Sequence, residues 1–171
     1  MHMLRDFQNI SPSVAESAFI AENAVIIGDV EIGEEASIWY NCVLRGDVNY
    51  IRIGDRTNLQ DATVIHVSSR YHSTIVEPDV VVGHTVTLHG CYVESGSLIG
   101  IGSVVLDGAR IGRDSLVAAG SLVTPGTEIP PGSFALGRPA RVVRDVTSEE
   151  IETQRRICEG YVELGSIYAR K

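Results

Sequence analysis

The sequence predicts an all-β solenoid, a parallel β-helix of hexapeptide repeats followed by a C-terminal α-helix. Three observations predict it. An aliphatic residue recurs every six positions from Val14 to Ile129, a small or β-branched residue stands four places after most of them, and helical spacing appears only near the end of the chain. A period of six fits neither the 3.6 residues of a helical turn nor the long alternation of an ordinary strand, whereas hexapeptide repeats form short parallel strands joined by tight turns.

The length and composition indicate one globular domain. The chain has 171 residues, of which 44% are hydrophobic and 21% charged, and its formal net charge is −8. Phosphate binding needs clustered Lys and Arg, so this acidic chain is not expected to bind nucleic acid. We find no apolar run of 18 residues and no secretory signal, and therefore expect no membrane span and a cytoplasmic location. Cys42, Cys91 and Cys158 follow no disulfide or metal-binding pattern, which fits reduced thiols.

The aliphatic repeat gives the order of the strands. Three hexapeptides make one coil of such a solenoid, so we assign the repeats in rotation to three faces, a, b and c. The repeat positions of face a are Val14, Ile32, Ile53, Val76, Val93, Ile111 and Ile129; those of face b are Ile20, Ile38, Leu59, Val82, Ile99 and Val117; those of face c are Ile26, Leu44, Ile65, Leu88, Val105 and Val123.

Two insertions interrupt this rhythm at one corner. The step from Leu44 to Ile53 is nine positions and the step from Ile65 to Val76 is eleven, in place of six, and both follow a face-c repeat. The step after the face-c repeat at Leu88 is one residue short. We therefore expect two loops to leave the corner between faces c and a.

Outward positions on face c form a ladder that ends in two histidines. Leu44, Ile65 and Leu88 occupy the inward position of face c in three neighbouring coils. The residue directly after each must point outward, and these residues are Arg45, His66 and His89. Neighbouring coils lie about 4.8 Å apart, so His66 and His89 can bind one metal ion. Neutral imidazole is a common zinc ligand, although the spacing of these histidines alone fits an ordinary surface or core role equally well.

His84 belongs to a different corner, because it follows Val82 of face b by two residues. It should not reach the same ion within its own chain, but a neighbouring copy could supply it in a three-fold arrangement. The sequence thus predicts a homotrimer with three sites, each shared between two chains. Asp61 stands one coil before His84 on face b. In the same way, Arg45 stands one coil before His66 on face c. Where His84 meets His66 across the interface, we therefore expect Arg45 to pair with Asp61.

The hexapeptide rhythm is expected to end after Ile129. The prolines of IPPGSFALGRPARVVR (129–144) resist further strand, and we assign the solenoid to residues 1–136 of a single domain.

A helix is predicted over residues 147–170, packed back along the solenoid. Thr147 with Glu150 three residues later is typical of a helix-capping box. Gly160 and Gly165 weaken the helix by up to about 1 kcal/mol each, which packing must offset. The residues that share one face at helical spacing are Ile151, Gln154, Ile157 or Cys158, Tyr161, Leu164 and Tyr168.

Five segments resemble the gamma-class carbonic anhydrase family over nearly the whole chain. They are LRGD (44–47), NLQD (58–61), VIH (64–66), VGHTVTLHGC (82–91) and GSVVLDGA (102–109). The resemblance implies a left-handed β-helix that assembles as a trimer, with a metal ion held by three histidines at each interface. Zn²⁺ is the expected metal, and Fe²⁺ or Co²⁺ are alternatives because imidazole suits all three.

The resemblance also implies the roles of individual residues. The metal ligands would be His66, His84 and His89. Tyr161 would lie near the metal, with core packing as the alternative. The implied reaction is the reversible hydration of carbon dioxide to bicarbonate, in which the metal lowers the pKa of water to about 7, an effect for which carbonic anhydrase is itself the standard example. The other implied site residues, at the interface or around the metal, are Arg45, Asp47, Gln60 and Asp61, with Gln60 hydrogen-bonded to the water or bicarbonate at the metal.

The loops depart from the family pattern, in which an acidic loop carries glutamates for proton transfer. Val48 stands just beyond Arg-Gly-Asp, and the loop SSRYHST (68–74) contains no carboxylate. Fast turnover requires a proton relay, so we expect slow hydration unless Tyr71 or His72 substitutes; a solvated loop histidine is the plainer interpretation. The alternatives are an acyl-coenzyme A thioesterase, a hexapeptide-repeat acyltransferase that needs no metal, and a catalytically dormant subunit.

Overall fold

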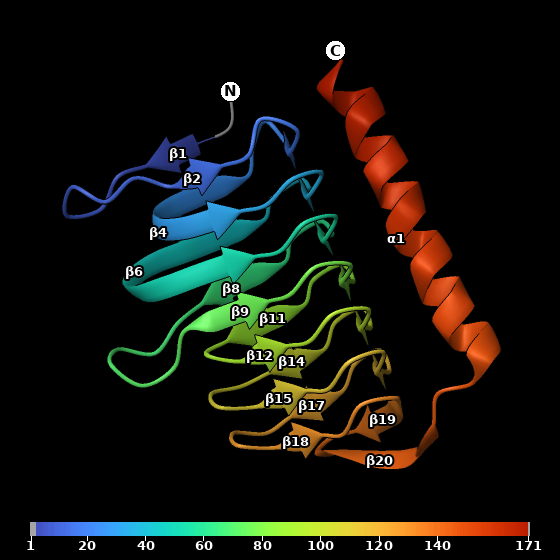
Figure 1. Cartoon of the computed structure of the whole chain (residues 1–171). Helices are drawn as coiled ribbons and strands as arrows, with labels where there is room; N and C mark the ends of the chain where they lie inside the picture. Colours follow the sequence, from blue (N-terminus) through green and yellow to red (C-terminus); the bar gives the residue numbers. More distant parts are fainter. Residues whose placement is uncertain (1–2, 171) are drawn as a thin grey trace.

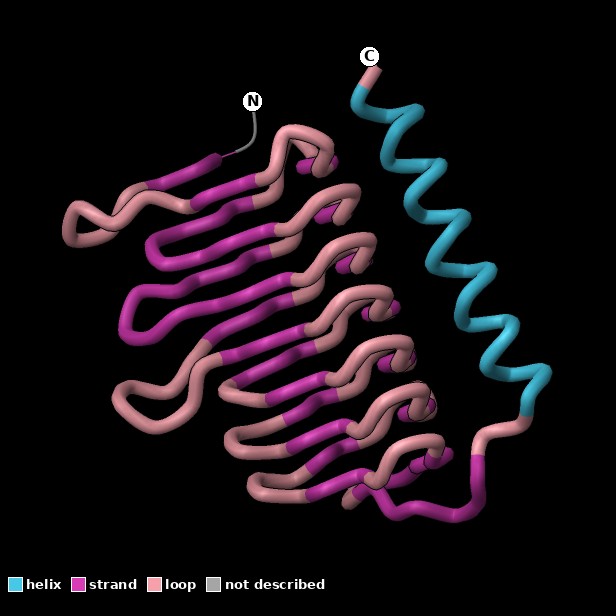
Figure 2. Tube along the Cα trace, viewed as in Figure 1, coloured by secondary structure: helices cyan, strands magenta, loops and turns pink. Residues whose placement is uncertain are grey.

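The computed structural model describes residues 3–170 as a stack of short parallel strands with one long helix beside it (Figure 1). Successive coils follow one another from the N-terminal end of the stack to the C-terminal end, and the final helix returns along the whole height of the stack (Figure 2). No helix in this part of the chain is long and apolar enough to cross a membrane.

The strands fall on the three predicted faces. Face a carries β2 (Ser13–Val14), β9 (Thr74–Val76), β12 (Tyr92–Val93), β15 (Arg110–Ile111) and β18 (Glu128–Ile129). Face b carries β3 (Phe19–Ile20), β5 (Ser37–Ile38), β7 (Asn58–Leu59), β10 (Val81–Val82), β13 (Leu98–Ile99), β16 (Leu116–Val117) and β19 (Ser133–Gly137). Face c carries β8 (Val64–His66), β11 (Thr87–His89), β14 (Val104–Val105) and β17 (Leu122–Val123). β4 (Val25–Ile32) and β6 (Val43–Ile53) run through faces c and a, and β1 (Met3–Arg5) pairs with β4.

The register is the one that the hexapeptide repeat predicts. Leu44 pairs with Ile65, Ile65 with Leu88, and Leu88 with Val105, so each repeat position stacks on the equivalent position one coil away. Of the nineteen aliphatic repeat positions, all but Val14 and Ile20 of the first coil are buried. The core of the solenoid is therefore a continuous column of Val, Ile and Leu, and the burial of this apolar surface is the main force that stabilises it.

Small residues fill the corners of each coil, where an inward side chain meets the turn. The buried hydroxyls of Ser97, Ser103 and Ser115 donate to main-chain carbonyl oxygens of the next coil, at 2.9, 3.1 and 2.8 Å. These bonds satisfy polar groups that would otherwise be unpaired in the interior.

The two insertions leave the predicted corner between faces c and a. β6 stays a continuous strand, but its register against β4 shifts after Gly46, so residues 47–50 have no partner in β4. The second insertion follows β8 and is closed by a bridge between Ser68 and His72. Both insertions therefore flank the outward ladder of face c.

The expectation that strands end at Ile129 is wrong. β19 adds one more strand to face b, pairing in parallel with β16, and β20 (Ala140–Asp145) then pairs antiparallel with β19. The prolines that suggested otherwise lie outside the paired positions, Pro130 and Pro131 before β19 and Pro139 in the turn before β20. Proline disrupts a strand only where its missing N–H is needed, and these positions do not need it.

The helix α1 (Ser148–Ala169) begins with the predicted capping box. Thr147 accepts from the Glu150 backbone N–H, and Glu150 accepts from the Thr147 backbone N–H. Its packing face contacts β3, β5, β7 and β10 of face b. Tyr161 and Tyr168 pack on Trp39, with ring centroids 5.4 and 5.2 Å away.

Leu164 was predicted on the packing face, but it is exposed, and Gly165 is buried there instead. A Cβ at Gly165 would lie 3.4 Å from the Cβ atoms of Phe19 and Ser37, so the glycine lets the helix approach face b closely.

Candidate metal centre

His66 and His89 meet at the corner between faces c and a. They end β8 and β11 and are register partners in adjacent coils. Nδ1 of His66 lies 3.1 Å from Nε2 of His89. Two nitrogens bound to one zinc ion at about 2.0–2.1 Å with tetrahedral angles are about 3.3–3.4 Å apart, so a metal ion fits this pair with little movement. The side chains are 21% and 32% exposed, which leaves the pair open to the outside of the solenoid.

Each of these imidazoles is held from behind by a carboxylate. Nε2 of His66 lies 2.9 Å from Oδ1 of Asp47, and Nδ1 of His89 lies 2.6 Å from Oδ1 of Asp107. Metal-binding histidines almost always donate their second ring N–H in this way, because the bond fixes the tautomer and the ring orientation. The donor set and its surroundings therefore fit a divalent metal ion.

The two carboxylates are set up to stay ionised. Burial alone would raise the pKa of Asp47, but hydrogen bonds from His66 and Arg45 outweigh it and lower that pKa. Burial would also raise the pKa of Asp107, but hydrogen bonds from Ser68 and His89 outweigh it and lower that pKa. Anionic acceptors make stronger hydrogen bonds to an imidazole N–H than neutral acceptors do. We call Arg45, Asp47, His66, His89 and Asp107 the His66–His89 half-site.

His84 lies at the other end of face c, in the turn before β11. Its Nδ1 is 2.9 Å from Oδ2 of Asp61, which occupies the equivalent turn one coil earlier. The two side chains are 41% and 43% exposed, and Nε2 of His84 takes no part in this contact. His84 thus repeats the pattern of an imidazole held by a carboxylate, at a separate corner.

Gln60 and Tyr161 lie on the same side of the molecule as His84. Gln60 is buried beside α1 and donates from its side-chain nitrogen to Oδ1 of Asn58 at 3.2 Å. Burial, with a smaller contribution from the charge of Asp61, raises the pKa of Tyr161. We call Gln60, Asp61, His84 and Tyr161 the His84 half-site.

The structure thus divides the predicted site residues into two groups within one chain. Within residues 3–170 of a single chain, no three His, Cys, Asp or Glu side chains converge on one point where a metal ion could bind. Arg45 pairs with Asp47 of its own chain, and Asp61 pairs with His84, so the pairing of Arg45 with Asp61 between chains stays a prediction.

Sequence reasoning missed Asp107 and Ser68. Asp107 lies in the segment GSVVLDGA (102–109) and follows His89 by 18 residues, which is one full coil. The coil period would have placed it beside His89. Ser68 could not be found in this way, because it belongs to an insertion outside the repeat.

The loop residues considered for proton transfer lie in different places. Tyr71 is 80% exposed at the tip of the second insertion. His72 is close to the solenoid, since a Cβ at Gly108 would meet its Cε1 at 3.1 Å and a Cβ at Gly90 would meet its Cβ at 2.8 Å. His72 therefore borders the His66–His89 half-site.

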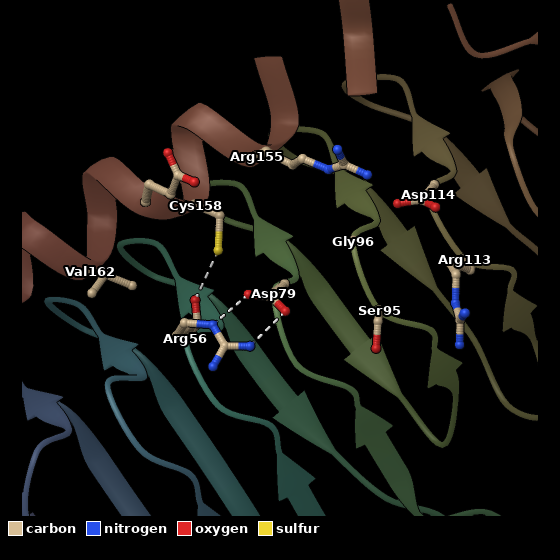
Figure 3. A pocket seen from close by; sticks show the side chains of 10 residues that line it. Arg56, Asp79, Ser95, Gly96, Arg113, Asp114, Arg155, Cys158 and Val162 are labelled. Carbon is tan, nitrogen blue, oxygen red and sulfur yellow. Dashed lines mark hydrogen bonds and ion pairs between the residues drawn. The ribbon is translucent and has the colours of Figure 1, made fainter. Parts of the chain in front are cut away.

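A separate groove of about 700 Å³ lies between α1 and the turns at the corner of faces a and b (Figure 3). Arg56 makes two bonds to Asp79 there, of 2.7 and 2.8 Å, and Sγ of Cys158 donates to the Arg56 carbonyl oxygen at 3.1 Å. Burial raises the pKa of the Cys158 thiol to about 11. None of its described lining residues is a histidine, so this groove lies apart from both half-sites.

Comparison with known proteins agrees with this architecture. Residues 11–46 and 90–125 match the family described as bacterial transferase hexapeptide (six repeats), in agreement with the predicted left-handed β-helix. The structure of a hexapeptide transferase family protein from Anaplasma phagocytophilum is 44% identical, with a TM-score of 0.93 over 97% of this chain and 98% of that one.

Several relatives carry a more specific name. A protein of Geobacillus kaustophilus named carbonic anhydrase is 49% identical over 97% of this chain and 91% of its own length. The mitochondrial gamma carbonic anhydrase 2 of Arabidopsis thaliana is 44% identical over 93% of this chain, which spans 59% of that longer protein. By sequence and by fold, the chain belongs to the gamma-class carbonic anhydrase family of hexapeptide-repeat proteins.

Proposed function

We propose that this protein catalyses the reversible hydration of carbon dioxide at metal sites shared between the chains of a homotrimer. The observation that carries the proposal is the His66–His89 pair, whose facing nitrogens are 3.1 Å apart and whose other nitrogens contact Asp47 and Asp107. Such a pair supplies two of the three imidazole ligands of a catalytic zinc site. The names of the Geobacillus and Arabidopsis relatives support the choice of reaction.

The third ligand would be His84 of a neighbouring chain. His84 and the His66–His89 half-site lie at the two edges of face c. If the c faces of three copies packed around a three-fold axis, the His84 half-site of each chain would meet the His66–His89 half-site of its neighbour. α1 covers face b, whereas face c carries an outward column of mainly apolar side chains in register. The column consists of Val43, Val64, Thr87, Val104 and Leu122.

The metal ion and the residues around it would have separate roles. A bound Zn²⁺ would act as a Lewis acid that lowers the pKa of water to about 7, and Fe²⁺ or Co²⁺ could take its place because imidazole also binds these ions. Asp47 would hold His66 in a fixed orientation, and Asp61 would do the same for His84. Gln60 and Tyr161 lie beside Asp61, where Gln60 can orient bicarbonate by a hydrogen bond.

Turnover is expected to be slow because the loops offer a poor path for protons. Tyr71 points into solvent and residues 68–74 contain no carboxylate. His72 borders the site and is the loop residue best placed to accept a proton.

Metal analysis and a hydration assay on the same preparations test the proposal. We expect about one metal ion per chain in the wild type, measurable hydration by pH-indicator stopped flow, and loss of both in His66→Ala, His84→Ala and His89→Ala. A fully metal-loaded wild type without hydration activity would contradict the reaction, and a metal-free but trimeric wild type would contradict the site.

A second candidate function is acyl transfer or thioester cleavage with acyl-coenzyme A. It is favoured by the transferase family match and by the Anaplasma relative's description. This function needs no metal, so activity that survives complete removal of the metal would favour it.

A further inference from the structure

We propose that Asp107, held by Ser68, is a positioning residue for His89 that keeps Nδ1 of this histidine protonated and presents Nε2 to the metal. The inference rests on the proposed metal site and assigns roles there to Asp107 and Ser68. Asp107 lies in the turn after β14, Ser68 in the insertion after β8, and His89 at the end of β11. Three separate segments of the chain therefore meet at this carboxylate.

Both oxygens of the carboxylate are engaged. Oδ1 lies 2.6 Å from Nδ1 of His89, and Oδ2 accepts from the Ser68 hydroxyl at 2.8 Å. With Ser68 on one oxygen, the carboxylate cannot rotate away from the imidazole without breaking a second bond. In neutral imidazole a proton on Nδ1 leaves the lone pair on Nε2, which is the nitrogen that faces His66.

Gly90 makes room for this arrangement. Its φ is +58°, and a Cβ at this position would lie 2.3 Å from Oδ1 of Asp107 and 2.8 Å from Cβ of His72. The backbone is also tied to the turn of Asp107, since the Gly108 N–H donates to the Gly90 carbonyl oxygen at 2.7 Å. Any larger residue here would displace either the carboxylate or the loop.

A purely structural explanation has to be separated from this one, because the solenoid repeats the same contact elsewhere. A Cβ at Gly33 would lie 2.3 Å from Oδ1 of Asp55, and a Cβ at Gly96 would lie 2.3 Å from Oδ1 of Asp114. An aspartate over a glycine is thus a common feature of these turns. What distinguishes Asp107 is the imidazole on one oxygen and the hydroxyl on the other, which makes Asp114 a matched control.

The first measurement is the tautomer of His89 in the metal-free protein, read from nitrogen-15 NMR of the imidazole above pH 8. We expect the Nδ1–H form in the wild type and a mixture of tautomers in Asp107→Ala. Asp107→Asn should keep the Nδ1–H form, because the amide oxygen can still accept the bond. Asp114→Ala should match the wild type.

The second measurement is the affinity for Zn²⁺ by competition with a chelator, with the absorption spectrum of the Co²⁺-loaded protein as a check of ligand geometry. Loss of a carboxylate behind a metal-binding histidine typically weakens binding about 10- to 100-fold, which is the loss expected for Asp107→Ala. Ser68→Ala should show a smaller loss in the same direction, and Asp114→Ala none.

The outcomes separate this inference from the proposed function. If the wild type binds no metal, the proposed function fails, while the tautomer still tests the role of Asp107. If Asp107→Ala changes neither the His89 tautomer nor the metal affinity, the inference is wrong. Equal losses of affinity in Asp107→Ala and Asp114→Ala would also overturn it, because they would show a general effect on the turns.

Discussion

His84 and His89 belong to the same coil but lie at opposite ends of β11, His84 in the turn before the strand and His89 as its last residue. His89 faces His66 of the previous coil, whereas His84 contacts Asp61. A site made of all three histidines therefore needs two chains, and this requirement can be tested by mixing inactive variants.

The first prediction is that His66→Ala and His84→Ala, each inactive alone, recover activity when their trimers exchange subunits. An intact site forms wherever a chain with His66 and His89 meets a chain with His84. Stopped-flow hydration assays on the exchanged mixture measure the recovery.

The matched control for this experiment is a mixture of His66→Ala with His89→Ala. Both substitutions damage the same half-site, so every site in the mixed trimers lacks a ligand and no activity should return. Verified exchange without recovery in the first mixture would show that the third ligand does not come from a neighbouring chain.

The second prediction concerns face c, the surface that we propose joins the chains. Val64 lies in the outward column of face c and is 41% exposed, and Leu136 of β19 is 44% exposed outside that face. A charge buried in an interface without a partner is strongly unfavourable, so Val64→Asp should convert the trimer to monomer and remove the bound metal. Sedimentation velocity at a fixed protein concentration measures the change.

Leu136→Asp is the control for this substitution, since it places the same charge on a side chain of similar exposure. It should leave the sedimentation coefficient unchanged. If Val64→Asp remains trimeric and retains its metal, face c is not the interface.

The solenoid was predictable because each coil repeats the same sequence pattern. Every repeat position carries an aliphatic residue, and a slip of one residue would expose the whole column, so the register of Leu44, Ile65 and Leu88 followed from spacing alone. The repeat ended later than expected, because Pro130 and Pro131 lie before β19 where no ladder N–H is needed.

The candidate site was predictable only as far as the repeat reaches. His66 and His89 were placed together by the coil period, and the structure has their nitrogens 3.1 Å apart. The position of Ser68 depends on the path of an insertion, which no repeat determines. The burial of Gly165 in place of Leu164 depends on how closely α1 approaches Phe19, and helical spacing does not specify that distance.

The third prediction uses two glycines of α1 that have opposite surroundings. A Cβ at Gly160 would have no atom within 4 Å, so Gly160→Ala should raise the free energy of unfolding by about 1 kcal/mol through helix propensity. At Gly165 the nearest atoms are 3.4 Å from the Cβ position, so Gly165→Leu should lower it by about 1–3 kcal/mol through overpacking against face b.

Urea titrations at one protein concentration measure both changes, because the stability of an oligomer depends on concentration. The fluorescence of Trp39, which contacts Tyr161 and Tyr168, reports the helix docking. If Gly165→Leu raised the free energy of unfolding as Gly160→Ala does, the close approach of α1 to face b at Gly165 would be contradicted.

The last prediction concerns pH and the start of α1. The hydrogen bond from Arg144 and the bond from the Thr147 backbone N–H lower the pKa of Glu150 from 4.5 to about 2. Because the pKa is lower in the folded state than in the unfolded state, the charge of Glu150 stabilises the fold above pH 4.5. This contribution falls as the pH drops from 4.5 towards 2, where the folded-state carboxylate is protonated as well.

Glu150→Gln keeps an oxygen for the Thr147 N–H but removes the charge, so it should be less stable than the wild type at pH 6. The difference should shrink steadily at pH 4 and pH 3. Denaturant titrations at the three pH values measure it, and Glu152→Gln, which removes an equal charge from the exposed side of the same helix, provides the reference. A difference between wild type and Glu150→Gln that stays constant from pH 6 to pH 3 would show that Arg144 does not hold the Glu150 carboxylate in its charged form.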